Sequence, residues 1–171
     1  MNKKALLIGL LLTVPLLVLF GLGLGNDPDI MASPLLGKPA TTFILDDFDG
    51  NITALADLRG KPIVLNFWAS WCQPCIYETP LLVAAAKRYG ERVHFIGVVP
   101  PEDSPEAVTA FQQRFGDWGP TLYDRDGKVG IAYGVFKLPE TYLIDADGIV
   151  REKVAGALQP EPLLESIEKL L

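Results

Sequence analysis

The sequence contains two cysteines, Cys72 and Cys75, which form a Cys-x-x-Cys motif. A nearly continuous apolar run, Ile63–Phe67, precedes the motif and is typical of a buried strand in a parallel or mixed sheet. A helical pattern of apolar residues follows the motif and extends to about Tyr89. The motif is therefore predicted to lie at a strand-to-helix junction, an arrangement typical of redox-active cysteine pairs.

The start of a helix favours one of the two thiols as the nucleophile. The first turn presents unpaired N–H groups and the positive end of the helix dipole, which both stabilise a thiolate. Cys72 lies at this start, so we expect it to be the more exposed thiol and to have a lowered pKa. Cys75 lies one turn further along, within reach of a mixed disulfide formed on Cys72.

Other uses of two cysteines are less well supported by the sequence. An inert bridge would close a very short loop, which stabilises least in the chain-entropy model. A zinc site needs four ligands, and the chain offers two cysteines and a single histidine, His94. Haem attachment needs a histidine directly after the motif, where this chain has Ile76. Binding of Cu(I) by the two thiolates stays open.

The charge of the chain disfavours one class of partner. The net charge is −6, and removing Lys3 and Lys4 from the 15 basic residues leaves 13 against 21 acidic ones, or −8. An acidic domain is a poor candidate for binding nucleic acid, because the phosphate backbone would repel it.

The N-terminus has the pattern of a membrane anchor. Met1–Lys4 is basic, and Ala5–Gly25 carries no charge and would span about 31 Å as a helix, close to the roughly 30 Å of a bilayer core. This run is longer than the apolar part of a cleaved signal peptide, although Gly23–Gly25 resembles a weak cleavage site. We expect residues 1–25 to form an uncleaved transmembrane helix, residues 26–36 to form a linker, and the remainder to be exported.

Residues 37–171 are predicted to form one α/β domain. A hairpin with a turn at Gly50 comes first, and strands then alternate with helices up to a second hairpin at Gly148. Ser104 and Pro105 are typical of a helix start. This order predicts a mixed central sheet flanked by helices, with the first hairpin as an N-terminal extension. The expected strands are 42–45, 52–55, 63–67, 93–99, 121–123, 141–144 and 149–154, and the later helices are 105–115, 128–133 and 160–171.

A carboxylate is predicted to lie behind the cysteines. A helical period places Cys75, Glu78, Leu82 and Tyr89 on one face, which we expect to be buried because its other members are mostly apolar. Burial would raise the pKa of Glu78, so that it would accept or return the proton of Cys75. The alternative is a partly exposed Glu78 at the rim of the helix.

Three features of the chain resemble the thioredoxin-like fold. They are the motif Trp71–Cys75, a helix proline at Pro80, and Pro139 before the last hairpin. The resemblance implies that the peptide bond before Pro139 is cis and that this proline faces the dithiol.

Longer segments are similar to the DsbE/CcmG-type cytochrome c biogenesis oxidoreductases, within the TlpA/ResA-like group. Ser33–Ala40, Leu65–Cys72 and Gly134–Asp145 carry this likeness, and Glu78 falls where the group has its active-site carboxylate. The chain departs from the group at Phe136–Leu138, where a small residue usually precedes the proline.

The resemblance implies a reductant on the periplasmic side of the bacterial inner membrane. It would keep the Cys-x-x-Cys-His thiols of apocytochrome c reduced, without a metal or other cofactor, and would receive electrons from a DsbD/CcdA-like membrane protein. Cys72 would attack the client, Cys75 would resolve the mixed disulfide, and Glu78 would move the proton of Cys75. The residues expected to contact the client are Trp71, Gln73, Pro74, Leu138, Pro139 and Glu140.

Three other functions compete with this one. A general exported reductant with broader clients would use the same residues. An oxidant of the DsbA kind is disfavoured, because no His or Lys lies between the cysteines to stabilise a thiolate further. A Cu(I)-binding or delivery module belongs to a different functional class.

Overall fold

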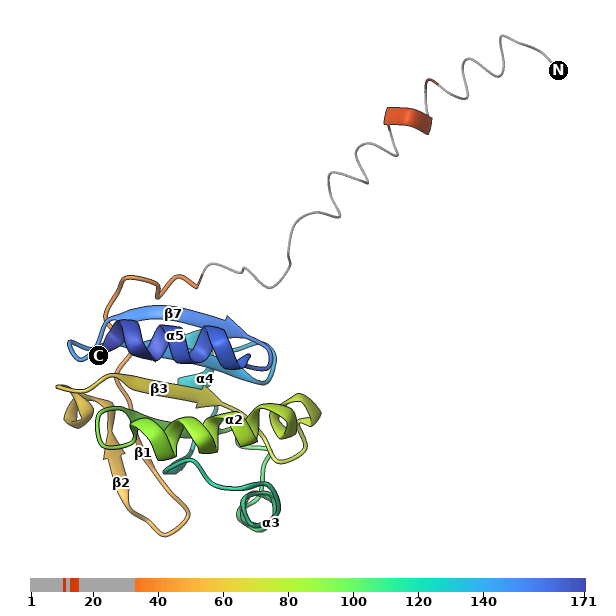
Figure 1. The fold of residues 1–171 in the computed structure, drawn as a ribbon. Coiled ribbons are helices and arrows are strands. Elements are labelled where there is room, and N and C mark those ends of the chain that lie inside the picture. Colours follow the sequence, from red (N-terminus) through yellow and green to blue (C-terminus); the bar gives the residue numbers. More distant parts are fainter. Residues whose placement is uncertain (1–10, 12, 16–32) are drawn as a thin grey trace. The chain divides into compact units, whose positions relative to one another are not determined.

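A computed structural model describes residues 11, 13–15 and 33–171 of the chain. The chain divides into two units, Met1–Met31 and Ala32–Leu171, and the second contains the sheet and its helices (Figure 1). The predicted anchor, residues 1–25, lies outside the described residues except for residues 11 and 13–15, and so do residues 26–32 of the predicted linker, residues 26–36. In the part of the chain that the structure describes, no helix combines the length and apolarity that a membrane crossing requires.

The domain is built on a five-stranded mixed sheet with the strand order β5-β4-β3-β6-β7. The first three of these strands are parallel to one another, and β6 and β7 add an antiparallel edge. This arrangement confirms the mixed sheet predicted from the sequence. The strands are β3 (Ile63–Phe67), β4 (His94–Val99), β5 (Thr121–Tyr123), β6 (Glu140–Ile144) and β7 (Val150–Ala155).

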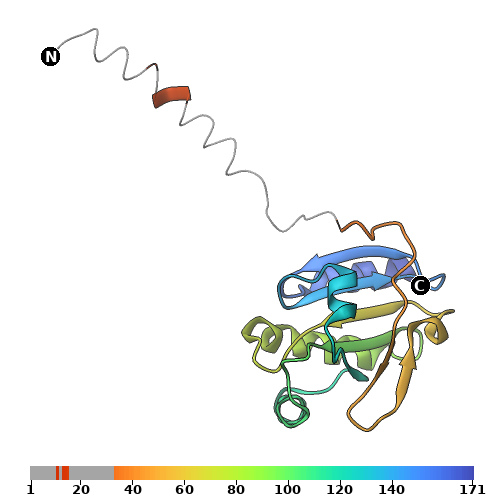
Figure 2. The same ribbon diagram turned by 180° about the vertical axis from the view of Figure 1, so that it is seen from behind.

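Helices cover both faces of the sheet. α2 (Gln73–Tyr89), α3 (Pro105–Phe115) and α5 (Pro160–Leu170) pack on one face, and α4 (Lys128–Tyr133) packs on the other (Figures 1 and 2). The central strand β3 is buried along its whole length, because its alternate side chains point into the two apolar layers. Its sequence therefore lacks the apolar-polar alternation of a half-exposed strand.

Local sequence signals set the helix starts. The Ser104 hydroxyl accepts a hydrogen bond from the Ala107 N–H at 3.2 Å and caps α3, as predicted. Each of the helices α2, α3 and α5 has a proline in its first turn, where the missing N–H removes no helical hydrogen bond. α2 continues through Pro80 to its end at Tyr89.

The predicted hairpin extension is also confirmed. β1 (Ile44–Asp46) and β2 (Ile52–Ala54) form a separate antiparallel pair, followed by the short 3₁₀ helix η1 (Leu55–Leu58). An ion pair of 2.8 Å joins Asp46 of this hairpin to Arg125, which follows β5. The hairpin is thereby attached to the main sheet without extending it.

Candidate active site

The two cysteines lie at the N-terminus of α2, directly after β3. They form a disulfide with an S–S distance of 2.04 Å. Cys72 is the N-cap residue, and its Sγ accepts a hydrogen bond from the Cys75 N–H at 3.3 Å. The strand-to-helix junction is confirmed, and the sulfur of Cys72 already faces the N–H donors that stabilise a thiolate.

The exposures of the two cysteines differ in the predicted direction, but by little. Cys72 is 4% exposed and Cys75 is 1% exposed. Both pack in the apolar cluster that contains Val64 and Trp68, which explains why neither residue is open to solvent in the disulfide form.

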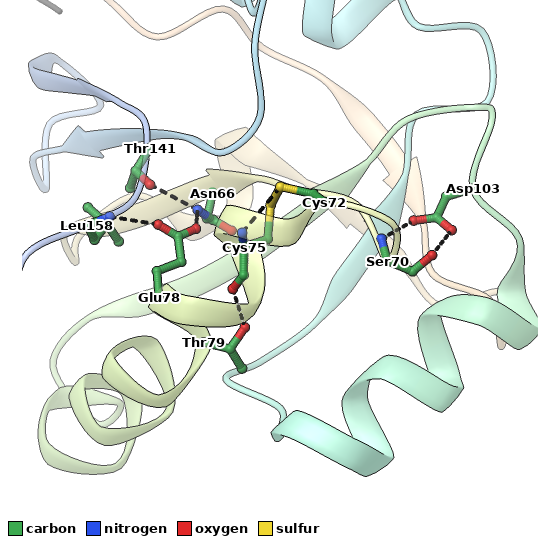
Figure 3. The surroundings of a disulfide bond; sticks show 9 residues. All are labelled: Asn66, Ser70, Cys72, Cys75, Glu78, Thr79, Asp103, Thr141 and Leu158. Atoms are coloured by element: carbon green, nitrogen blue, oxygen red, sulfur yellow. Dashed lines mark hydrogen bonds between the residues drawn. A yellow bond between two sulfur atoms is a disulfide. The ribbon is translucent and has the colours of Figure 1, made fainter.

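Glu78 lies on the buried face of α2 and is 2% exposed (Figure 3). Its Oε1 accepts a hydrogen bond from Asn66 Nδ2 at 2.9 Å, and its Oε2 accepts one from the Leu158 N–H at 2.9 Å. Burial raises the pKa of Glu78 to about 7, against the opposing effects of the Leu158 and Asn66 hydrogen bonds. The predicted inward orientation is confirmed, and the rim alternative is wrong.

The three other members of this network, Asn66, Thr141 and Leu158, are absent from the sequence prediction. Asn66 is fully buried in β3, and its Nδ2 also donates to Thr141 Oγ1 of β6 at 2.9 Å (Figure 3). Asn66 is the one polar residue in the run Ile63–Phe67. Because buried polar groups need hydrogen-bond partners, this interruption of an apolar strand is a signal that points to the site.

A second network fixes the turn before Cys72. The N–H and the hydroxyl of Ser70 both donate to the carboxylate of Asp103 at 2.6 Å (Figure 3). Asp103 is 3% exposed, lies in the loop after β4, and also accepts a hydrogen bond from the Ser104 N–H at 3.0 Å. Sequence patterns do not predict this contact, because Ser70 and Asp103 belong to separate loops.

The segment before β6 has the geometry that the resemblance implied. The Leu138–Pro139 peptide bond is cis, and Pro139 is buried. Leu138 is half-buried, whereas Phe136 is 56% exposed. The departure from the family pattern at Phe136–Leu138 therefore places large apolar side chains at or near the surface.

An apolar groove of about 700 Å³ lies beside this segment. Trp71, which is 63% exposed, and Leu138 line it together with Phe136 and Ile131. Exposed apolar side chains gathered in one groove are typical of an interaction site. The remaining lining residues are Phe67, Val98, Val99, Pro100, Pro101, Glu102, Asp124, Asp126, Gly127, Gly130, Val135 and Lys137.

The other three predicted client contacts differ in their exposure. Gln73 and Pro74 are exposed in the first turn of α2. Glu140 is fully buried, and its Oε2 lies 2.8 Å from Nζ of Lys153, whose side chain is 6% exposed. The carboxylate that was predicted to contact the client thus faces the interior, because the lysine from β7 neutralises it there.

Comparison with known proteins agrees with this geometry. The profile of the AhpC/TSA family matches residues 36–153. The chain belongs to this family. It is 40% identical to the thiol:disulfide interchange protein DsbE of Allochromatium vinosum, over 99% of this chain and 93% of the relative. It is 33% identical to the thiol-disulfide oxidoreductase ResA of Bacillus thuringiensis, over 79% of this chain and 78% of the relative.

A solved structure extends the comparison to the fold. The structure of a secreted Mycobacterium tuberculosis disulfide oxidoreductase homologous to Escherichia coli DsbE covers 75% of this chain and 96% of its own, with a TM-score of 0.68 and 28% identity. The chain is therefore a thiol-disulfide oxidoreductase of the DsbE and ResA type with a thioredoxin-like fold.

Proposed function

We propose that this oxidoreductase acts as a reductant on the exported side of a bacterial inner membrane and keeps the Cys-x-x-Cys-His thiols of apocytochrome c reduced for haem attachment. The observation that carries the proposal is the buried carboxylate of Glu78 one helical turn after Cys75. A reductant must release the proton of its resolving thiol each time it delivers two electrons, and Glu78 is suited to accept that proton.

The proposed reaction has two exchange steps. The Cys72 thiolate attacks a client disulfide, so one client sulfur leaves as a thiolate and a mixed disulfide forms. Cys75 then gives its proton to Glu78 and attacks Sγ of Cys72, which releases the second client sulfur. The client gains two electrons and its two thiolates take up protons from solvent. The enzyme is left as the Cys72–Cys75 disulfide, with the proton of Cys75 on Glu78.

The pKa of Glu78 suits this role. Burial raises it to about 7, so the carboxyl group is close to half-ionised at neutral pH. A group in this state accepts a proton during resolution and returns it when the disulfide is reduced again. A carboxyl with an ordinary pKa would hold the proton too weakly to do so.

The groove offers a surface for the client next to the disulfide. Trp71, in the turn before α2, and Gln73 and Pro74, in its first turn, would approach the client from one side. Leu138 and Pro139 would approach it from the segment before β6. The charged residues that line the groove are Glu102, Asp124, Asp126 and Lys137. Their excess of negative charge favours a client with basic residues near its cysteines.

Localisation and electron supply complete the proposal. Residues 1–25 would anchor the enzyme in the membrane, with the domain on the periplasmic side. A lone dithiol in an oxidising compartment needs a dedicated donor, for which a DsbD/CcdA-like membrane thiol transporter is suited.

The reduction potential of the Cys72–Cys75 pair tests the direction of the reaction. Equilibration of the enzyme with a thiol buffer should give a value near that of thioredoxin, about −270 mV. A value near that of DsbA, about −120 mV, would make the enzyme an oxidant and contradict the proposal.

Turnover of a client peptide tests the residues and the client together. Cys72→Ser and Cys75→Ser should abolish reduction of a disulfide-bonded Cys-x-x-Cys-His peptide, and Glu78→Gln should slow resolution about 100-fold. The control peptide has the same composition with the histidine moved away from the motif. Equal rates on both peptides would favour a general reductant.

A further inference from the structure

Only one of the two polar atoms of the Asn66 amide has hydrogen-bond partners. Its Nδ2 donates to both Glu78 Oε1 and Thr141 Oγ1, each at 2.9 Å. Its Oδ1 is buried and has no hydrogen-bond partner among the described residues. A buried carbonyl without a donor is costly, so its retention at this position calls for a physical reason.

The position of Asn66 connects it to the cysteines. Alternate residues of a strand point to the same face, so Asn66 shares the face of Val64, which packs in the same apolar cluster as Cys72 and Cys75. In Figure 3 the Asn66 side chain lies between the Glu78 carboxylate and the disulfide. The unpartnered carbonyl thus belongs to a side chain on the face of β3 that packs against the cluster containing Cys75.

We propose that Asn66 is a positioning residue for the resolving step: its NH₂ group holds Glu78 as a carboxylate, and its Oδ1 accepts the S–H of Cys75 in the reduced enzyme. The inference deepens the proposed function and rests on Glu78 being the acceptor of the Cys75 proton. Asn66 neither gains nor loses a proton in this scheme.

The redox state explains why the carbonyl lacks a donor in this structure. In the disulfide form, Cys75 has no S–H to offer. Reduction adds this donor, and Oδ1, which has no other donor among the described residues, is then available to it. The S–H is thereby held next to the carboxylate that takes its proton during resolution.

The groups around Glu78 determine in which direction its pKa should change when Asn66 is replaced. The groups around it are the Asn66 amide from β3 and the Leu158 N–H that precedes α5, which both donate to it, and the Cys72–Cys75 pair at the start of its own helix. The two cysteines are the titratable members of this set, and they do not titrate as a disulfide. Because the Asn66 donor favours the charged form, its removal raises the pKa of Glu78.

The first test is Asn66→Leu, which keeps the volume and removes both polar atoms. In the oxidised full-length chain, ¹³C NMR titration of the Glu78 carboxyl should show its pKa rising by about one to two pH units. In turnover, the pH profile of resolution should shift upward by the same amount. A Glu78 pKa that stays unchanged in the Asn66→Leu variant would overturn the proposal.

Two controls test whether Asn66 sets the pKa of Glu78 or only supports the fold. Thr79→Val removes another buried hydrogen bond of α2, from Thr79 Oγ1 to the Cys75 carbonyl, and should leave the Glu78 pKa unchanged. In a chain that already carries Glu78→Gln, the further change Asn66→Leu should not shift the pH profile of resolution. If Glu78→Gln itself does not slow turnover, the proton role of Glu78 fails, but the NMR titration still decides the role of Asn66.

A measurement on the unmodified chain covers the case in which Asn66→Leu does not fold. The side-chain NH₂ resonances of Asn66 should titrate with the same midpoint as the Glu78 carboxyl. The Asn66 ¹³Cγ resonance should shift when the disulfide is reduced, because Oδ1 gains a donor. A ¹³Cγ resonance that is identical in the two redox forms would overturn the contact with Cys75.

Discussion

Glu78 and Glu140 are both buried carboxylates close to the active site, but their negative charges have different kinds of partner. Glu140 is fully buried and has the cation of Lys153 at 2.8 Å. Glu78 is 2% exposed and accepts hydrogen bonds from two neutral donors, Asn66 and Leu158. Because its donors are neutral, the charge of Glu78 has no counterion among the described residues, and burial raises its pKa to about 7. A counterion makes a carboxylate structural, whereas its absence allows the group to take up a proton.

The ion pair of Glu140 supports the segment that precedes Pro139. Nζ of Lys153 also donates to the carbonyl of Gly134 at 3.2 Å. The same nitrogen lies 5.3 Å from the ring centroid of Phe136 and 5.4 Å from that of Tyr142. One buried cation therefore joins β7, β6 and the segment that borders the groove.

The largest expected effect comes from breaking this ion pair. Lys153→Met would leave the Glu140 carboxylate buried without its partner, which should lower the free energy of unfolding by about 3–5 kcal/mol. Denaturant unfolding followed by circular dichroism measures this loss. Adding Glu140→Gln to Lys153→Met should recover part of it, since the orphaned charge is removed. A loss of unfolding free energy below about 1 kcal/mol would show that Glu140 does not depend on its counterion, and the contrast with Glu78 would fail.

A pH-dependent effect should distinguish Glu78 from Glu140. Glu78 has a pKa of about 7 in the folded chain against an ordinary value of 4.5. The folded state thus holds the proton more tightly, and the stability that Glu78 contributes is fully present below pH 4.5 and lost as the pH rises through 7. Between pH 4.5 and 8, the stability of Glu78→Gln relative to the unmodified chain should increase by about 3 kcal/mol. Unfolding curves of both chains across this pH range measure the change. A difference in unfolding free energy that does not vary with pH would refute the raised pKa of Glu78.

The smallest of these effects concerns a third buried carboxylate, Asp103. Its hydrogen bonds come from Ser70 and Ser104, so it fixes the turn before Cys72 without taking part in proton transfer. Asp103→Asn replaces an acceptor with a donor that faces these N–H groups, and should destabilise the fold by about 2 kcal/mol. Ser70→Ala is the matched control, because it removes one of the two Ser70 hydrogen bonds and should cost about half as much. Equal losses would mean that the Ser70 hydroxyl carries the whole contact.

Much of the fold could be predicted because its signals are local. Helix starts at Ser104 and Pro160 follow from capping residues and first-turn prolines, which act within one turn. The inward position of Glu78 follows from helical periodicity alone. The side chain of Glu140 shows the limit of such signals, since the sequence places it next to Pro139 but does not show that Lys153 neutralises it from the neighbouring strand.

The sequence by itself determined the chemistry at the start of α2: two thiols one turn apart at a helix N-terminus, with a carboxylate one turn further along the same face. Helical geometry fixes these relations within a few residues. The tertiary structure alone decided what surrounds that carboxylate. Asn66, Thr141 and Leu158 come from β3, β6 and the segment before α5, and they meet because sheet register and helix packing bring distant parts of the chain together. Propensity and periodicity act over a few residues, so they do not contain this information.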